Sequence, residues 1–294
     1  MNEVVLEDVL EGLRKIPDGT ADCVLIDPPY NIGYDFGNNK RKTDIENYVA
    51  WANEWLGESK RILKPSGTIF VYGFSEILAH ISASTELEHR WLVWHYTNKT
   101  VPSLNFWQRS HESLLCMWKN KDERIFNRED VREPYTDKFV QGYKGKNRKR
   151  PASGGRFGAK KVTSYTVNEK GALPRDVIKE STLAGGAGSK SRISYCSKCE
   201  VAIVGNAEAK EHADHKEFII KHPTQKPFKV TERLLKSCMP EMGTVVVPFA
   251  GTGSECIVAQ SLNYNFLGFE INPDFVKMAN AAIKKMNKTL DTDS

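Results

Sequence analysis

The chain has 294 residues, and 40% of them are hydrophobic, which suffices for one sizeable α/β domain with an insertion or for two small domains. The net charge of +5, from 42 basic and 37 acidic residues, is modest and excludes little. Six cysteines do not suggest a disulfide framework, no apolar run reaches the roughly 18–20 residues of a membrane helix, and the first residues lack the basic start of a secretion signal. We therefore expect a reduced, cytoplasmic setting and no membrane partner.

Residues 1–120 are expected to alternate strands and helices. Cys23–Ile26 predicts a short apolar strand that runs directly into Asp27-Pro28-Pro29-Tyr30. A helix is predicted from about Ile45 to Leu63, because its apolar residues recur at helical spacing and Pro65-Ser66-Gly67 ends it. Further strands are predicted at 68–72, 91–96 and 114–118. This order indicates a mainly parallel sheet covered by helices.

The Asp27-Pro28-Pro29-Tyr30 turn suits the recognition of an amino group. It follows a strand, and open α/β sheets bind ligands at the carboxyl ends of their strands. Two prolines remove two N–H donors, so the turn presents acceptors, namely the Asp27 carboxylate and the Pro28 carbonyl. Two acceptors hold the hydrogens of an exocyclic amino group and make its nitrogen more nucleophilic, while Tyr30 offers a face for a base. The alternative is a structural turn with a capping aspartate.

Residues 121–217 are polar, glycine-rich and charged, and we interpret them as an insertion of loops and a small module. Between residues 138 and 161 there are nine basic residues and no acidic ones. Such a loop can follow a phosphate backbone, although a solvated surface loop has the same composition. The candidate DNA contacts are Lys144, Lys146, Arg148, Lys149 and Arg150.

The same insertion contains a candidate metal site. Cys196-x-x-Cys199 is followed after twelve residues by His212-x-x-His215, and two thiolates with two imidazoles complete a tetrahedral zinc shell. The two residues between the histidines are fewer than usual, and His222 is an alternative ligand. We expect one structural zinc that stabilises a module too small to bury a core of its own. The alternative is free thiols and exposed histidines in a charged loop.

Residues 218–287 return to the α/β pattern, and 288–294 are expected to form a flexible tail. The strand 245–247 is followed by a turn containing Gly251-x-Gly253 and by a helix, and the next strand ends at Glu270. Small residues at such a turn admit a ligand close to the backbone, and the carboxylate accepts hydrogen bonds from ribose hydroxyls. The pattern therefore predicts a site for a cofactor that contains a nucleoside.

Together these segments resemble the motif set of the amino-DNA methyltransferases. The residues that carry the resemblance are Asp27-Pro28-Pro29-Tyr30, His222-Pro223-Thr224-Gln225-Lys226-Pro227 and Pro248-Phe249-Ala250-Gly251-Thr252-Gly253-Ser254. The run from Asn105 to Glu112 is similar to a further motif beside the target-base pocket. The order, with the catalytic motif first and the cofactor motif last, resembles the beta class of this family. The similarity covers roughly residues 1–120 and 217–285.

The resemblance implies a Rossmann-like, circularly permuted fold of S-adenosylmethionine-dependent methyltransferases, with an inserted target-recognition region at 121–217. It implies a catalytic half at 1–120 and a cofactor-binding half at 218–287. Asp27, Pro28, Pro29 and Tyr30 would then serve a flipped-out base. S-adenosylmethionine would lie against Asp27, Phe249, Gly251, Gly253, Ser254 and Glu270, with Thr224 and Lys226 near its methionine end. The family usually has an acidic residue where this chain has Val247, which removes one polar contact to the cofactor.

The expected activity is DNA (adenine-N6) methylation, because family members with aspartate at the position of Asp27 mostly modify adenine. Methylation of cytosine N4 is the first alternative. Methylation of RNA or protein glutamine is disfavoured because such enzymes usually have asparagine there, and the chain lacks the Pro-Cys dipeptide of cytosine-C5 enzymes. A last alternative is an inactive, zinc-containing DNA-binding protein. The resemblance also implies double-stranded DNA as partner, a bacterial or phage-infected cell, and possible dimerisation and a companion restriction endonuclease.

Overall fold

The computed structural model describes residues 1–31, 43–98, 103–143, 148–150, 163–165, 167–183 and 191–292. It divides into two compact units, one of Met1–Phe126 with Asp176–Ser294 and a smaller one of Asn127–Arg175. The expected insertion spanned 121–217, whereas the structure groups its part from Asp176 onward with the larger unit. None of the described helices combines the length and apolarity needed to span a bilayer.

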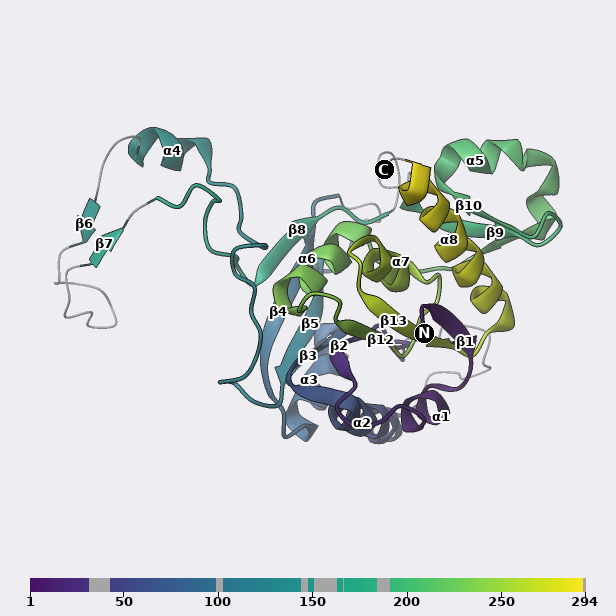
Figure 1. The fold of residues 1–294 in the computed structure, drawn as a ribbon, viewed down its shortest axis with the longest axis horizontal. Coiled ribbons are helices and arrows are strands. Elements are labelled where there is room, and N and C mark those ends of the chain that lie inside the picture. The colour runs from purple at the N-terminus through teal and green to yellow at the C-terminus, as the bar shows by residue number, and fades with distance from the viewer. Residues whose placement is uncertain are drawn as a thin grey trace. The chain divides into compact units, whose positions relative to one another are not determined.

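The centre of the larger unit is an eight-stranded sheet (Figure 1). Its strands are β1 (Glu3–Leu6), β2 (Ala21–Ile26), β3 (Leu63–Gly73), β4 (Glu88–Tyr96), β5 (His111–Trp118), β8 (Val177–Glu180), β12 (Thr244–Val247) and β13 (Asn265–Glu270). Their order is β1-β13-β12-β2-β3-β5-β4-β8, and every neighbouring pair is parallel except the two that include β5. The predicted mainly parallel sheet is confirmed.

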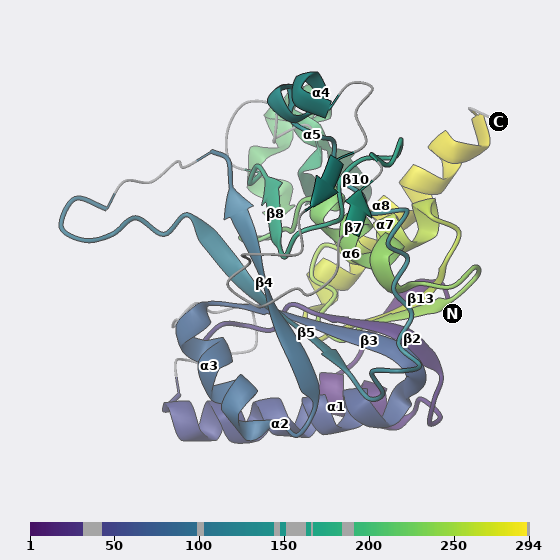
Figure 2. The same ribbon diagram turned by 90° about the vertical axis from the view of Figure 1, so that its left-hand side faces the viewer.

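Helices cover both faces of this sheet. They are α1 (Val9–Arg14), α2 (Ile45–Ile62), α3 (Ser75–Ser84), α6 (Phe228–Cys238), α7 (Ser254–Ser261) and α8 (Pro273–Thr292). Figure 2 shows α1, α2 and α3 on one face and α6, α7 and α8 on the other. A hydrophobic core lies on each face of the sheet, and successive side chains of a strand point to opposite faces. In β12, Val245 and Val247 belong to the core with α6, α7 and α8, while Val246 belongs to the core with α1, α2 and α3. Such two-sided burial explains why the central strands are continuously apolar.

Several boundaries differ from the sequence-based expectations. The helix α2 does end at Ile62, but Pro65-Ser66-Gly67 belongs to β3, where the pairing with β2 shifts from Ala21–Leu63 to Cys23–Thr68. The extra residues therefore form an irregularity at the start of a strand. The helix α8 runs to Thr292, into the expected tail.

A second, three-stranded sheet belongs to the larger unit. It has the order β10-β9-β11 and consists of β9 (Ile193–Cys196), β10 (Val201–Val204) and β11 (Ile219–Lys221), with α5 (Gly205–Glu211) and the 3-10 helix η2 (Ala213–Phe218) between β10 and β11. We call residues 191–221 the Cys/His module. Lys285 of α8 donates to the carbonyl of Ala202 and pairs with Glu208 of α5, so the module is tied to α8.

The smaller unit contains α4 (Asp137–Tyr143), β6 (Arg148–Arg150) and β7 (Thr163–Tyr165). The segment before α4 and the segment after β7 are joined by two backbone hydrogen bonds between Glu133 and Ala172. Of the predicted DNA contacts, Lys144 and Lys146 lie outside the described residues. Arg148, Lys149 and Arg150 are described only as the backbone of β6, so the structure leaves this prediction untested.

Candidate active site

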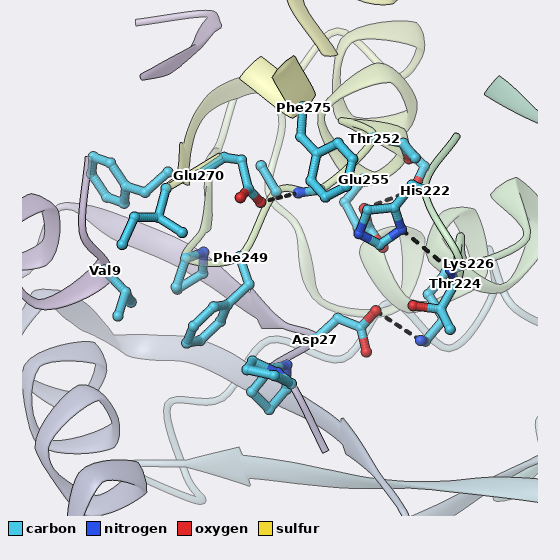
Figure 3. Close-up of a pocket in the computed structure, with 18 of the residues that line it drawn as sticks. Val9, Asp27, His222, Thr224, Lys226, Phe249, Thr252, Glu255, Glu270 and Phe275 are labelled. Carbon is cyan, nitrogen blue, oxygen red and sulfur yellow. Dashed lines mark hydrogen bonds and ion pairs between the residues drawn. The ribbon is translucent and has the colours of Figure 1, made fainter. Parts of the chain in front are cut away.

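The carboxyl ends of β1, β2, β12 and β13 surround one pocket of the larger unit. Residues from all four ends line it, together with residues of the segment between β11 and α6. Figure 3 shows Asp27 and Lys226 pointing toward one another at one end of the pocket, with Glu270 and Val9 at the other. Antiparallel β5 begins where the parallel strands end, so its second residue, Glu112, reaches the same pocket. The pocket lies where parallel α/β sheets bind ligands.

Asp27 and Lys226 form a buried ion pair although they are 199 residues apart. The Lys226 ammonium lies 2.7 Å from Asp27 Oδ2 and 3.5 Å from Glu112 Oε2, and its side chain is only 3% exposed. Burial by itself lowers the pKa of Lys226, but the attraction of the two carboxylates outweighs it and raises that pKa above its usual value. Lys226 is therefore a permanent positive charge inside the pocket.

Tyr30 joins the two carboxylates. Its hydroxyl lies 2.8 Å from Asp27 Oδ1 and 2.9 Å from Glu112 Oε2, and Glu112 also accepts a hydrogen bond from Tyr96 at 2.7 Å. A hydroxyl has one proton, so Tyr30 can donate to only one of these two acceptors at a time. Burial raises the pKa of Asp27, even though Lys226 opposes the shift. This end of the pocket is therefore suited to accept or exchange a proton.

The glycine turn and Glu270 form the opposite end. Gly251 and Gly253 have positive φ values of 49° and 74°, which favour glycine. The N–H of Gly251 donates to Glu270 Oε2 at 2.9 Å, and the N–H of Asn272 donates to Oε1 at 2.9 Å. These bonds fix the carboxylate and leave each oxygen a further lone pair for a hydroxyl group. A Cβ on Gly253 would lie 2.8 Å from Ala279 Cβ, so this glycine permits close packing of α8.

Glu255, which the sequence motifs did not predict, adds a further carboxyl group to the pocket. Val247 is buried in the core, whereas Glu255, in the first turn of α7, lines the pocket and is 4% exposed. Ser254 Oγ donates to it at 2.8 Å. Burial, followed by the negative charge of Asp27, raises the pKa of Glu255 to about 7. A carboxyl group, absent at position 247, is thus present in the pocket eight residues later.

An aromatic wall and one histidine complete the pocket. Phe249 packs edge-on against Trp51, with ring centres 5.7 Å apart, and both line the cavity. His222 contacts Phe275 and accepts a hydrogen bond from the Thr224 N–H at its Nδ1. Burial lowers the pKa of His222 to about 4, and the positive charge of Lys226 acts in the same direction. The imidazole is therefore neutral near pH 7.

The structure brings together most of the residues predicted from the motifs. Those that line the one pocket are Asp27, Pro28, Pro29, Tyr30, Thr224, Lys226, Phe249, Gly251, Ser254 and Glu270. Gly253 supports the packing of α8 instead of lining the pocket. Trp51 and Glu255 were not predicted. A carboxylate directly after the glycine turn was the available signal for Glu255, but no local pattern indicates that a residue of α2 reaches Phe249.

The predicted metal ligands also come together, in the Cys/His module. Each of Cys196, Cys199, His212 and His215 contributes one ligand atom, and these four atoms lie within 4.8 Å of one another. His222, the alternative ligand, lies in the pocket described above. The short spacing of His212 and His215 is accommodated because His212 ends α5 and His215 lies at a kink of η2.

Comparisons with known proteins agree with this geometry. The profile of the DNA methylases that modify N6 or N4 positions matches residues 21–281, so the chain belongs to this family. The type II methyltransferase M.HpaI of Haemophilus parainfluenzae is 25% identical over 281 residues, which cover 94% of this chain and 72% of that protein. The DNA adenine methyltransferase YhdJ of Escherichia coli is 24% identical over 279 residues, covering 94% and 80%.

Solved structures share the fold. The cytosine-N4-specific PvuII DNA methyltransferase superposes with a TM-score of 0.59 at 15% identity, covering 98% of this chain and 90% of that one. The putative DNA modification methylase TTHA0409 of Thermus thermophilus, in complex with S-adenosylmethionine, gives 0.56 at 16% identity, covering 97% and 94%. The predicted fold of S-adenosylmethionine-dependent methyltransferases is thereby confirmed. The similar proteins thus include a DNA adenine methyltransferase and a cytosine-N4-specific one.

Proposed function

We propose that the protein transfers the methyl group of S-adenosylmethionine to N6 of a flipped-out adenine in duplex DNA. The observation that carries this proposal is the single pocket that contains both the Asp27-Pro28-Pro29-Tyr30 turn and the glycine turn after β12. One turn offers acceptors for an amino group, and the other offers space and a carboxylate for a nucleoside. A methyl donor and an amino acceptor that share one pocket can react without a covalent enzyme intermediate.

The two ends of the pocket suit the two ends of the cofactor. The Glu270 carboxylate, which Gly251 and Asn272 hold in place, would accept hydrogen bonds from its ribose hydroxyls, and Phe249 would contact its adenine. Thr224 and Lys226, which lie at the other end of the pocket in Figure 3, would hold its methionine end. The sulfonium carries a positive charge, which Asp27 and Glu255 stabilise. Burial makes these interactions stronger than they are in water.

The target base then enters beside Asp27. The Asp27 carboxylate and the Pro28 carbonyl accept the two hydrogens of the amino group, so that its nitrogen faces the methyl group. The nitrogen forms the new N–C bond while the C–S bond breaks and the electron pair remains on sulfur. The methylated nitrogen then releases one proton to the Asp27 cluster. Alignment of two bound reactants supplies much of the acceleration.

Adenine is the proposed base for two reasons. Asp27 occupies the tetrapeptide position at which adenine-modifying members of the family mostly have aspartate. A relative that is 24% identical over most of the chain is a DNA adenine methyltransferase. Cytosine N4 is the competing target, because the PvuII methyltransferase has the same fold.

Duplex DNA is the proposed substrate, and exposed apolar side chains in a loop that leads to the pocket support it. The loop between β4 and β5 leads to Glu112 and carries Leu104, Phe106 and Trp107, which are 80–90% exposed. Exposed aromatic rings stack on bases, and extraction of a base leaves a gap that such rings can fill. A companion restriction endonuclease is proposed because relatives are named type II methyltransferases. The setting we propose is the cytoplasm of a bacterial or phage-infected cell, and a homodimer stays a prediction.

One structural zinc is the proposed metal. Cys199 Sγ lies 3.2 Å from His215 Nδ1 and 3.7 Å from His212 Nδ1, and Cys196 Sγ lies 3.7 Å from His215 Nδ1. A tetrahedral zinc with two sulfur and two nitrogen ligands has S–N edges of about 3.6 Å. Among the residues of α5 and η2, only Gly205 is buried. A metal therefore supplies stabilisation that these two helices do not gain from packing.

The test uses labelled cofactor. Purified protein is incubated with S-adenosylmethionine tritiated in its methyl group and with unmethylated duplex DNA, and the nucleosides are separated after digestion. Label in N6-methyl-2′-deoxyadenosine is the expected result. Label in N4-methylcytosine would retain the mechanism and overturn the base assignment. Absence of label, with cofactor binding demonstrated separately, would contradict the proposed function.

A further inference from the structure

We propose that the Cys/His module, once it holds zinc, positions the cofactor-binding segment His222–Lys226 through the side chain of Gln225. The inference rests on the proposed zinc and cofactor sites and assigns Gln225 a positioning role. It connects two features that are otherwise separate, a metal cluster at the surface and the buried Lys226.

Gln225 is bonded to the module by both ends of its amide group. Its Oε1 accepts from the N–H of Ile193 at 2.8 Å, and its Nε2 donates to the carbonyl of Ser191 at 2.8 Å. These two partners are backbone groups at the start of β9. The side chain of Gln225 thus continues the hydrogen bonding of the small sheet and fixes the segment to it.

The strand β9 runs directly from this contact to the metal cluster. It begins at Ile193 and ends at the ligand Cys196, three residues or about 10 Å further along. Its inner face is buried: Ile193 and Tyr195 belong to the same core as α8. Its other end, Cys196, pairs with Val201 and Ile219, and its thiol lies against His215 of η2, whose residues are not buried. Zinc would fix that end of β9 and, with it, the position of the Gln225 contact.

The strand β11 provides a second connection. It pairs with β9, with Ile219 opposite Cys196 and Lys221 opposite Ser194. The residue after β11 is His222, which lines the cofactor pocket and limits the space at Gly251, where a Cβ would lie 3.0 Å from His222 Nε2. The segment is therefore connected to the module twice, by β11 at its start and by the Gln225 side chain at the start of β9.

The segment ends in the buried ion pair. Lys226 follows Gln225 directly, and its ammonium contacts Asp27 and Glu112. A shift of the backbone at Gln225 moves Lys226 away from these carboxylates and moves Thr224 and His222 at the cofactor pocket. The expected consequence of zinc loss is therefore weaker binding of S-adenosylmethionine, and not only lower stability of the module.

The experiment measures cofactor affinity with and without zinc in two proteins. Metal content is first determined by mass spectrometry, and about one zinc per chain is expected. S-adenosylmethionine affinity is then measured by calorimetry for the wild type and for Gln225→Ala, each as purified and after chelation. Zinc removal should weaken wild-type binding at least five-fold. Gln225→Ala should weaken it by a similar factor while retaining its zinc, and chelation should then have little further effect.

Controls separate positioning from unfolding. Circular dichroism and tryptophan fluorescence should stay native in Gln225→Ala, and its KM for the cofactor should rise by a larger factor than kcat at saturation falls. Gln225→Glu keeps an oxygen acceptor for Ile193 but removes the donor to Ser191, so its affinity should be intermediate. Substitution of the exposed His80 by alanine should leave both metal content and affinity unchanged.

Three outcomes would overturn the inference. The first is a protein that contains no zinc, and the second is a cofactor affinity that does not depend on zinc. The third is a chelated Gln225→Ala protein whose loss of cofactor affinity equals the product of the two separate losses. Failure of the proposed methyl transfer is distinguishable, because cofactor affinity is measured without DNA. Zinc-dependent binding in a protein that does not methylate DNA would support the inference and contradict the function.

Discussion

At the scale of single residues, Glu255 gives the pocket a property that depends on pH. Its carboxyl is buried beside Asp27, and its pKa of about 7 means that it is about half protonated at neutral pH. A bound sulfonium ion favours the ionised form, because opposite charges attract strongly when they are buried together. Cofactor binding and proton release are therefore linked.

This linkage predicts that S-adenosylmethionine binding at pH 7 releases up to about half a proton. Affinity should rise with pH up to about 7 and then level off, because the carboxyl that must ionise is protonated below that pH. Calorimetry in buffers of different ionisation enthalpy measures the released proton. Glu255→Gln should abolish the release, whereas the same substitution at the exposed Glu217 should not. Equal proton release by Glu255→Gln and the wild type would assign the linkage to another group.

The residues of the site differ in how far the sequence predicts them. Asp27 and Gly251 lie in short motifs whose chemistry is local, so the sequence indicates both their position and their use. The contact between Tyr30 and Glu112 joins residues 82 apart, and that of Asp27 with Lys226 joins residues 199 apart. No spacing rule specifies such pairs. The first arises because antiparallel β5 begins at the edge where β2 ends, and the second because the segment between β11 and α6 lines the same pocket.

At the scale of elements, the loop between β4 and β5 is exposed and leads to Glu112, which lines the pocket. Leu104, Phe106 and Trp107 project from it, and two residues further on Arg109 stacks over Phe74 and pairs with Glu76. The base of the loop is thus fixed to the protein while its apolar residues face solvent. This arrangement suits insertion of a ring into a DNA duplex.

Replacing Phe106 and Trp107 by alanine should therefore impair base flipping. A stacked base contributes about 1–3 kcal/mol, so roughly a ten-fold loss in the flipped population is expected. The fluorescence of 2-aminopurine at the target position measures it, once the target sequence is known. Affinity for S-adenosylmethionine should not change. Phe126→Ala removes an exposed phenylalanine elsewhere and serves as control. Normal flipping by the double variant would exclude the loop from this role.

The sequence predicts the central elements better than the peripheral ones. The apolar strands at 23–26 and 245–247 and the helix from Ile45 are confirmed, since each has a strong periodicity or an apolar run bounded by turn residues. The strands of the Cys/His module have only three or four residues each, too few for a clear periodicity, and none of them was predicted. Their position depends on α8, as the bonds of Lys285 indicate, and on their pairing with one another.

At the scale of the whole molecule, two parts are proposed to share recognition and catalysis. The larger unit contains the pocket and the Cys/His module, and the smaller unit contains the basic residues around β6. The expected target-recognition region therefore includes sequences from both units. Positive charge in the smaller unit is proposed to contact the DNA backbone, which would supply affinity without sequence preference.

Simultaneous replacement of Lys146, Arg148 and Lys149 by alanine tests that proposal. DNA affinity should fall, and the slope of log K against log salt should decrease by about 0.9 for each phosphate that the variant no longer neutralises. Binding is measured by fluorescence anisotropy at several salt concentrations. The control replaces three exposed lysines elsewhere, namely Lys121, Lys210 and Lys277. If the two triple variants bind DNA equally well, the basic segment does not bind the phosphate backbone.

The central claim is that Asp27 holds the amino group during methyl transfer, and single-turnover transfer by Asp27→Ala tests it most directly. The rate from tritiated S-adenosylmethionine to DNA should fall about a hundred-fold or more, as expected when a positioned proton acceptor is removed. The fold should survive, cofactor binding should weaken far less than transfer because Glu255 remains in the pocket, and Asp18→Ala, which removes an exposed carboxylate, should transfer normally. A nearly normal rate for Asp27→Ala would contradict the mechanism.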